Sequence, residues 1–334
     1  MNFDQIISSL EKKQYKPVYF LTGEQAYYID EISNYIENNV LDESEKDFNQ
    51  TIVYGRDTNE HTIISSAKRF PMMAQYQVLI VKEAQDLKHI EELESYIKSP
   101  LDSTILVLCY KYKKIDKRKA FYKAVSKYGE FFESEVVREY QVPAWIAGYL
   151  KKKQYTIGPR ECALLSDHLG NNLSKIVNEL EKLSINVPVG STITAHHIEE
   201  NIGISKDYNI FELQDALGQK KIEKATRIIN YFASNTKDYP VPMVTAILFT
   251  YFMKVGIFHE IVDKSKNNVA STLGINPFFV KDFEKAAQYY SRKSVARVIS
   301  LLREYDLKSK GVDNASTSQG ELLRELIYKI LHVG

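Results

Sequence analysis

The feature that most constrains this chain is a segment that has the layout of a nucleotide-binding fold but lacks the residues that hold phosphates. Residues 18–21 predict a buried strand, 22–25 a turn and 27–40 a helix. A P-loop neutralises phosphates with backbone N–H groups and one lysine. This turn contains Gly23 but no lysine, and its Glu24 would repel a triphosphate. We therefore expect a chain that positions partners and does not turn over a substrate.

The charge balance argues against a dedicated nucleic-acid binder. The 334 residues include 44 lysines and arginines against 43 aspartates and glutamates, whereas nucleic-acid binders usually show a marked basic excess. Local basic patches stay compatible with this balance. Cys109 and Cys162 lie far apart in apolar segments, so we expect two buried thiols with no disulfide or metal-ligand spacing.

No segment predicts membrane insertion. Residues 1–5 lack the basic region and apolar core of a signal peptide. Residues 241–258 are apolar but include Pro242 and Lys254, and a membrane helix needs about 20 mostly apolar residues. We expect a buried helix there and a cytoplasmic protein.

The first part of the chain alternates strand and helix patterns. Continuous apolar runs suit strands that are covered on both faces, and hence a parallel sheet. The predicted strands are 18–21, 49–54, 78–81, 104–108 and 129–132, and the predicted helices are 27–40, 60–68, 90–97 and 121–128.

From about Pro143 onward the patterns predict helices only. Leucines between 165 and 183 recur at steps of three and four, which is typical of amphipathic helices. Gly170 and the two asparagines after it interrupt this stripe, so we expect two helices joined there. The fold class expected is α/β plus all-α. The domains expected are a parallel-sheet domain at 1–140, a small helical lid at 141–205 and a helical C-terminal domain at 206–334.

The strand at 78–81 is followed by Lys82-Glu83. In AAA+ ATPases the matching strand ends in Asp-Glu, which positions magnesium and the attacking water. Four further segments stand out by their order and spacing, namely 17–24, 170–183, 210–213 and 305–311. Together these sequences resemble the delta-subunit family of bacterial DNA polymerase III clamp loaders, over essentially the whole chain.

The resemblance implies an AAA+-like three-domain chain that needs no cofactor or metal and has no catalytic residues of its own, although it would be a subunit of an enzyme, the DNA polymerase III holoenzyme. Its C-terminal collar would join ATP-binding gamma/tau subunits and a delta-prime subunit in a five-membered ring. Its first domain would insert a hydrophobic wedge into the beta sliding clamp and open it.

The family carries its wedge, usually Leu-Phe, just before the third strand. The corresponding residues here are Phe70, Pro71, Met72 and Met73, so the apolar pair would be Met72 and Met73. Methionine is flexible and adapts to irregular grooves. The alternative is that both methionines pack under the sheet as core residues.

A basic run after the fourth strand is a candidate contact for primer-template DNA, because lysines and arginines bind phosphates. The alternative is a solvated loop and helix start. Two other functions stay open: a divergent AAA+ ATPase, and a delta-prime-type ring subunit. The basic residues are Lys111, Lys113, Lys114, Lys117, Arg118 and Lys119.

Overall fold

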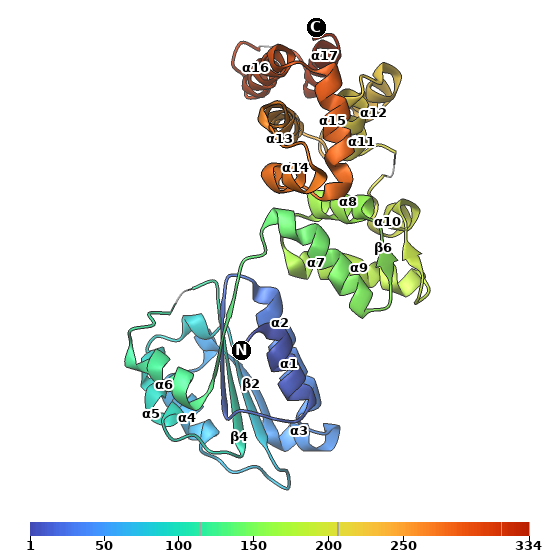
Figure 1. Cartoon of the computed structure of the whole chain (residues 1–334). Helices are drawn as coiled ribbons and strands as arrows, with labels where there is room; N and C mark the ends of the chain where they lie inside the picture. The colour runs from blue at the N-terminus through green and yellow to red at the C-terminus, as the bar shows by residue number, and fades with distance from the viewer. Residues whose placement is uncertain (114, 206, 315, 334) are drawn as a thin grey trace. The chain divides into compact units, whose positions relative to one another are not determined.

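A computed structural model describes residues 1–113, 115–205, 207–314 and 316–333. The chain divides into two compact units (Figure 1). The first comprises Met1–Arg138 with Asn171–Lys175, and the second comprises Glu139–Gly170 with Ile176–Gly334. Lys114, one of the predicted DNA contacts, lies outside the described residues.

The first unit is built on a parallel sheet with strand order β2-β3-β4-β1-β5. The first strand, VYFLTG, is buried at every position, as expected for a strand covered on both faces. The sequence patterns predicted all five strands to within three residues at either end, the largest difference being at the end of β4. The strands are β1 (Val18–Gly23), β2 (Gln50–Tyr54), β3 (Gln77–Lys82), β4 (Thr104–Lys111) and β5 (Glu130–Ser134).

Helices cover both faces of this sheet, and Figure 1 shows α1 and α2 on one side and α4, α5 and α6 on the other. Alternate strand residues therefore enter two separate cores, with Phe20 in one and Leu21 in the other. The helices are α1 (Phe3–Glu11), α2 (Ala26–Asn39), α3 (Glu43–Asn49), α4 (Glu60–Ala67), α5 (Glu94–Ile97) and α6 (Ala120–Tyr128), with 3-10 turns η1 (Gly55–Asp57), η2 (Ala84–Asp86) and η3 (Ile90–Leu93).

The second unit begins with helices that carry a two-stranded parallel ribbon, β6 (Thr156–Ile157) and β7 (Thr192–Ile193). The expectation of helices only beyond Pro143 was therefore wrong. The predicted break at Gly170 is present, because α8 ends at Leu169 and α9 begins at Leu173. The elements here are η4 (Glu139–Gln141), α7 (Val142–Lys152), α8 (Pro159–Leu169), α9 (Leu173–Asn186) and α10 (Ala195–Ile202).

Helices alone form the rest of this unit over its described residues, as predicted, and they share one large apolar core. The fold class is thus an α/β sheet region followed by an all-α region; the three domain boundaries stay predictions. The elements are α11 (Ile210–Gly218), α12 (Ile222–Ser234), α13 (Val241–Glu260), α14 (Lys266–Leu273), η5 (Pro277–Phe279), α15 (Val280–Tyr289), α16 (Arg292–Ser309) and α17 (Gln319–Leu331).

Helix α13 is, within the described residues, the one helix long and apolar enough to cross a membrane. It places Val244, Leu248, Phe252 and Val255 fully inside the C-terminal core. Core helices of globular proteins meet the same criteria of length and composition, so this one helix is weak support for a membrane span.

Candidate functional site

The carboxyl edge of the sheet is where a P-loop protein would bind phosphates, and here it is closed by packing. Gly23 ends β1 between Lys111 of β4 and Ser134 of β5. Its φ is +122°, and a Cβ there would lie 2.3 Å from the Ser134 carbonyl oxygen. The N–H of Gln25 donates a 3.1 Å hydrogen bond to Ser134 Oγ. A donor that a P-loop would direct at phosphate is thus already engaged within the protein.

Lys111 occupies this edge as part of an internal ion-pair cluster. Its Nζ lies 2.7 Å from Asp30 Oδ1 and 3.4 Å from Glu83 Oε1, and its side chain is only 14% exposed. Burial alone would lower the pKa of Lys111, but the hydrogen bond and charge of Asp30, with those of Glu83, raise it on balance. Lys111 therefore stays charged and neutralised by its own neighbours.

The aspartate with which an AAA+ ATPase would position magnesium is replaced by Lys82 at the end of β3. Lys82 Nζ lies 3.1 Å from Glu37 Oε2, so a second ion pair stands where magnesium would be held. Among the described residues no group of three or more histidines, cysteines, aspartates or glutamates is placed to hold a metal ion. Both cysteines are buried free thiols, as predicted.

In the part of the basic run that the structure describes, the cations are not free. Lys117 pairs with Glu133, Arg118 with Asp116 and Lys119 with Glu91. Lys113 Nζ donates to the Gln85 carbonyl at 2.9 Å, and Lys111 is in the cluster described above. A DNA phosphate would have to compete with these partners. The DNA contact stays a prediction.

The segment between α4 and β3 presents the apolar side chains that the sequence singled out. Because it directly precedes β3, it lies at the amino edge of the parallel sheet, opposite Gly23. Met73 is fully exposed (103%), and Phe70 and Met72 are 75% and 62% exposed, whereas Pro71 is half-buried. The alternative that both methionines pack in the core is therefore wrong. We call residues 70–73 the apolar tip.

The base of the tip is fixed by a buried glutamine. Gln77 is 8% exposed, and its side-chain N–H₂ lies 3.2 Å from the Ala67 carbonyl and 2.5 Å from the Arg69 carbonyl. Thr104 Oγ1 donates to the same Ala67 carbonyl at 2.9 Å. These bonds tie the end of α4 to the start of β3, so the tip projects from a rigid stem.

Two residues at the end of α3, which contacts the tip through Asn49, were not singled out from the sequence. Phe48, at the end of α3, is 71% exposed, and Asn49 hydrogen-bonds the Met72 backbone from 23 positions away. Periodicity describes neighbours within one element, so it carries no signal for a bond between α3 and the tip.

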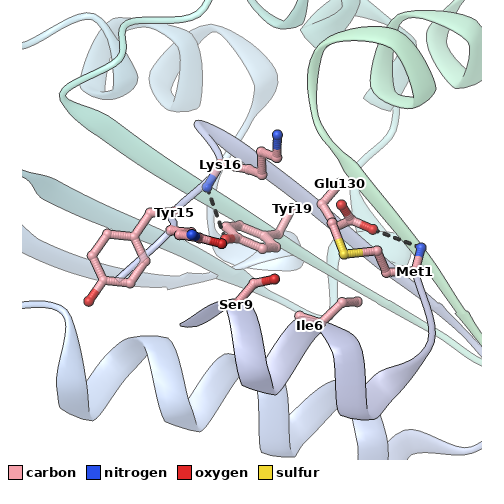
Figure 2. Close-up of a pocket in the computed structure, with 8 residues that line it drawn as sticks. Met1, Ile6, Ser9, Tyr15, Lys16, Tyr19 and Glu130 are labelled. Carbon is pink, nitrogen blue, oxygen red and sulfur yellow. Dashed lines mark hydrogen bonds and ion pairs between the residues drawn. The ribbon is translucent and has the colours of Figure 1, made fainter. Parts of the chain in front are cut away.

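A cavity of about 310 Å³ lies between α1 and the amino ends of β1 and β5 (Figure 2). The Met1 amine pairs with Glu130 Oε1 at 3.0 Å, and Tyr19 Oη accepts from the Lys16 N–H at 2.9 Å. Burial raises the pKa of Tyr19 to about 12. The Met1 amine, Glu130 and Tyr19 are thus engaged with neighbouring groups, and the raised pKa keeps the Tyr19 hydroxyl protonated near neutral pH.

Comparison with known proteins adds the family. Residues 19–137 match the family model described as "DNA polymerase III, delta subunit", and residues 207–325 match "DNA polymerase III delta subunit, C-terminal domain". The chain belongs to the DNA polymerase III delta subunit family. The first match covers the sheet with its apolar tip, and the second covers most of the C-terminal helices. Because both models describe the delta subunit, the alternative of a delta-prime-type subunit is not supported.

Individual relatives of the delta subunit family agree with this assignment. The chain is 28% identical over 322 residues to DNA polymerase III subunit delta of Bacillus subtilis (strain 168), covering 93% of this chain and 92% of that protein. It is 22% identical over 308 residues to the probable DNA polymerase III subunit delta of Aquifex aeolicus (strain VF5), covering 88% and 86%. The solved Bacillus subtilis DNA clamp loader delta protein shares the fold, with a TM-score of 0.54, 24% identity and coverage of 98% and 99%.

Proposed function

We propose that this delta subunit binds the beta sliding clamp through the apolar tip and opens it, within a loader that also contains gamma/tau and delta-prime subunits. It acts in the cytoplasm and hydrolyses no ATP itself. The observation that carries the proposal is the fully exposed Met73 on a fixed stem. A large apolar side chain held in water is stabilised when a partner covers it.

The proposed mechanism uses binding free energy and no chemistry within this chain. Burying a methionine side chain contributes roughly 1.5–3 kcal/mol before ordering costs. The rigid stem transmits that contact to the sheet, because Gln77 is the first residue of β3. The loader's ATP-binding subunits would supply the energy that controls when the tip reaches the clamp.

The carboxyl edge supports the view that this chain is not a divergent ATPase. Triphosphate binding there would require Asp30 and Glu83 to leave Lys111 and would bring Glu24 against the phosphates. No observation favours ATP hydrolysis as a second candidate function.

The test is to replace both tip methionines, Met72→Ser with Met73→Ser, and measure clamp affinity by surface plasmon resonance. Hot-spot residues contribute 2 kcal/mol or more each, so we expect affinity to fall about 100-fold or more. The matched control is Met243→Ser with Met253→Ser, since both are partly exposed on α13. Unchanged affinity of the tip variant would refute the proposed site.

Ring assembly is tested by truncation. A chain of residues 1–205 is expected to keep clamp binding and to lose co-purification with the other loader subunits, because the C-terminal helical region is absent. A truncated chain that still co-purified with those subunits would place the collar contact elsewhere.

A further inference from the structure

We propose that Asn49 is a positioning residue that holds the apolar tip in its clamp-binding conformation before the clamp arrives. The inference rests on the proposed function of the tip. It concerns a polar residue on another element, α3, which makes no part of the apolar surface itself.

The side chain of Asn49 forms hydrogen bonds with both backbone polar groups of Met72. Its Oδ1 accepts from the Met72 N–H at 2.6 Å, and its Nδ2 donates to the Met72 carbonyl at 2.9 Å. A carboxamide that bonds both the N–H and the C=O of one residue mimics a neighbouring strand, and it fixes the position of that residue.

Asn49 is itself held so that it can do this. The second N–H of Nδ2 donates to the Glu45 carbonyl at 3.0 Å, one turn back in α3, and the residue is only 4% exposed. All of its side-chain hydrogens are therefore engaged, and its geometry is set by α3. Asp42, whose side chain forms a capping box with Glu45, begins that helix.

The conformation of the tip explains why the hydrogen bonds from Asn49 are needed. Met73 has φ +54°, in the left-handed region that a residue with a side chain rarely adopts. Its side chain is fully exposed, so no packing of its own holds it there. The hydrogen bonds to Met72 fix the preceding residue, and Gln77 fixes the far end of the segment.

The expected consequence is a preformed tip. When a binding-competent conformation is populated only in part, the apparent Kd rises by the inverse of that fraction. We expect Asn49→Ala to leave the tip competent about a tenth of the time and hence to weaken clamp binding about tenfold. The matched control is Asn59→Ala, because Asn59 also accepts a backbone N–H, and its side-chain hydrogen bonds go to Thr62 in the first turn of α4.

A methionine NMR experiment separates positioning from loss of structure. The chain has five methionines, and three of them, Met1, Met243 and Met253, lie outside the tip. With ¹³C-methyl methionine, Asn49→Ala is expected to move the Met72 and Met73 signals toward random-coil shifts while Met243 and Met253 stay in place. Asn59→Ala is expected to move none of the tip signals.

A double-mutant cycle and the wild-type protein complete the test. In the Met72→Ser, Met73→Ser background, Asn49→Ala is expected to cause no further loss of affinity. In the wild-type protein the Met72 amide is expected to exchange slowly, since it donates to Asn49. This last measurement needs no variant to fold.

The outcomes distinguish this inference from the function beneath it. If the methionine variant loses affinity but Asn49→Ala binds as wild type, or if the Met72 amide exchanges at the rate of an unfolded peptide, Asn49 has no positioning role. An equal loss from Asn49→Ala in both backgrounds would also overturn it. If the methionine variant itself binds as wild type, the proposed function fails.

Discussion

The two edges of one parallel sheet have opposite characters. At the carboxyl edge, Gly23 packs against Ser134 and Lys111 is neutralised by Asp30 and Glu83. At the amino edge, Met73 stands in water on a hydrogen-bonded stem. One edge has its polar groups engaged within the chain, and the other leaves apolar surface uncovered. Changes at the first should therefore affect folding stability, and changes at the second should affect binding.

The largest effect on stability is expected from Gly23→Ala. The new Cβ would contact the Ser134 backbone at 2.3 Å in a left-handed conformation, which should lower the free energy of unfolding by about 3 kcal/mol. Urea denaturation measures this. Gly148→Ala is the control, because nothing lies within 4 Å of a Cβ there. A loss below about 1 kcal/mol for Gly23→Ala would show that the carboxyl edge is loosely packed.

A smaller loss is expected from Lys111→Ala. It removes a largely buried cation from two carboxylates, and hydrogen bonds to charged groups contribute about 2 kcal/mol. Lys98→Ala removes an exposed partner of Glu94 and should leave the free energy of unfolding almost unchanged, because solvent screens exposed ion pairs. The folded Lys111→Ala protein should bind the clamp with the affinity of wild type. A reduced affinity would show that changes at the carboxyl edge affect binding at the amino edge.

Phe70→Ser tests how far the amino edge extends beyond the methionines. Phe70 is 75% exposed, so its loss should leave the free energy of unfolding unchanged. As a flanking residue it should weaken clamp binding about fivefold, or roughly 1 kcal/mol. Phe278→Ser, an exposed phenylalanine of the second unit, is the control. If Phe70→Ser changed the free energy of unfolding more than the free energy of clamp binding, Phe70 would contribute to folding stability and not to the binding surface.

The smallest effect on stability is expected from adding magnesium and ATP to the protein. A site with a Kd of about 0.1 mM would stabilise the protein by about 1.4 kcal/mol at 1 mM ATP. Since the carboxyl edge is filled by its own ion pairs, thermal unfolding with and without magnesium and ATP should coincide. A measurable upward shift in Tm would reopen the ATPase alternative.

Much of this contrast was readable from the sequence, for local reasons. The strands were predicted because continuous apolar runs such as 104–108 are typical of strands that are buried on both faces of a parallel sheet. The absence of a P-loop lysine can be read directly from residues 22–25. The break at Gly170 was predicted because glycine and asparagine interrupt a helical stripe, and its φ of +72° agrees.

The features that were not predicted were missed for three different reasons. The helix α1 escaped prediction although Asn2 caps it and Ile6 and Leu10 are spaced by one turn; that signal was present. The two-residue strands β6 and β7 are too short for any periodicity. Two contacts join residues that are far apart in the chain: the hydrogen bonds between Asn49 and Met72, and the ion pair between Lys111 and Asp30. Sequence spacing alone does not encode such contacts.

The ion pairs around Lys111 have a consequence for how this fold can change over evolutionary time. A lysine restored to the loop after Gly23 would arrive beside a cation that already satisfies Asp30 and Glu83. Removing Lys111 first would leave two carboxylates together at the place where phosphates must sit. Under the proposed function, a change of this edge toward phosphate binding would therefore need several substitutions at once, because each of them alone is expected to be unfavourable.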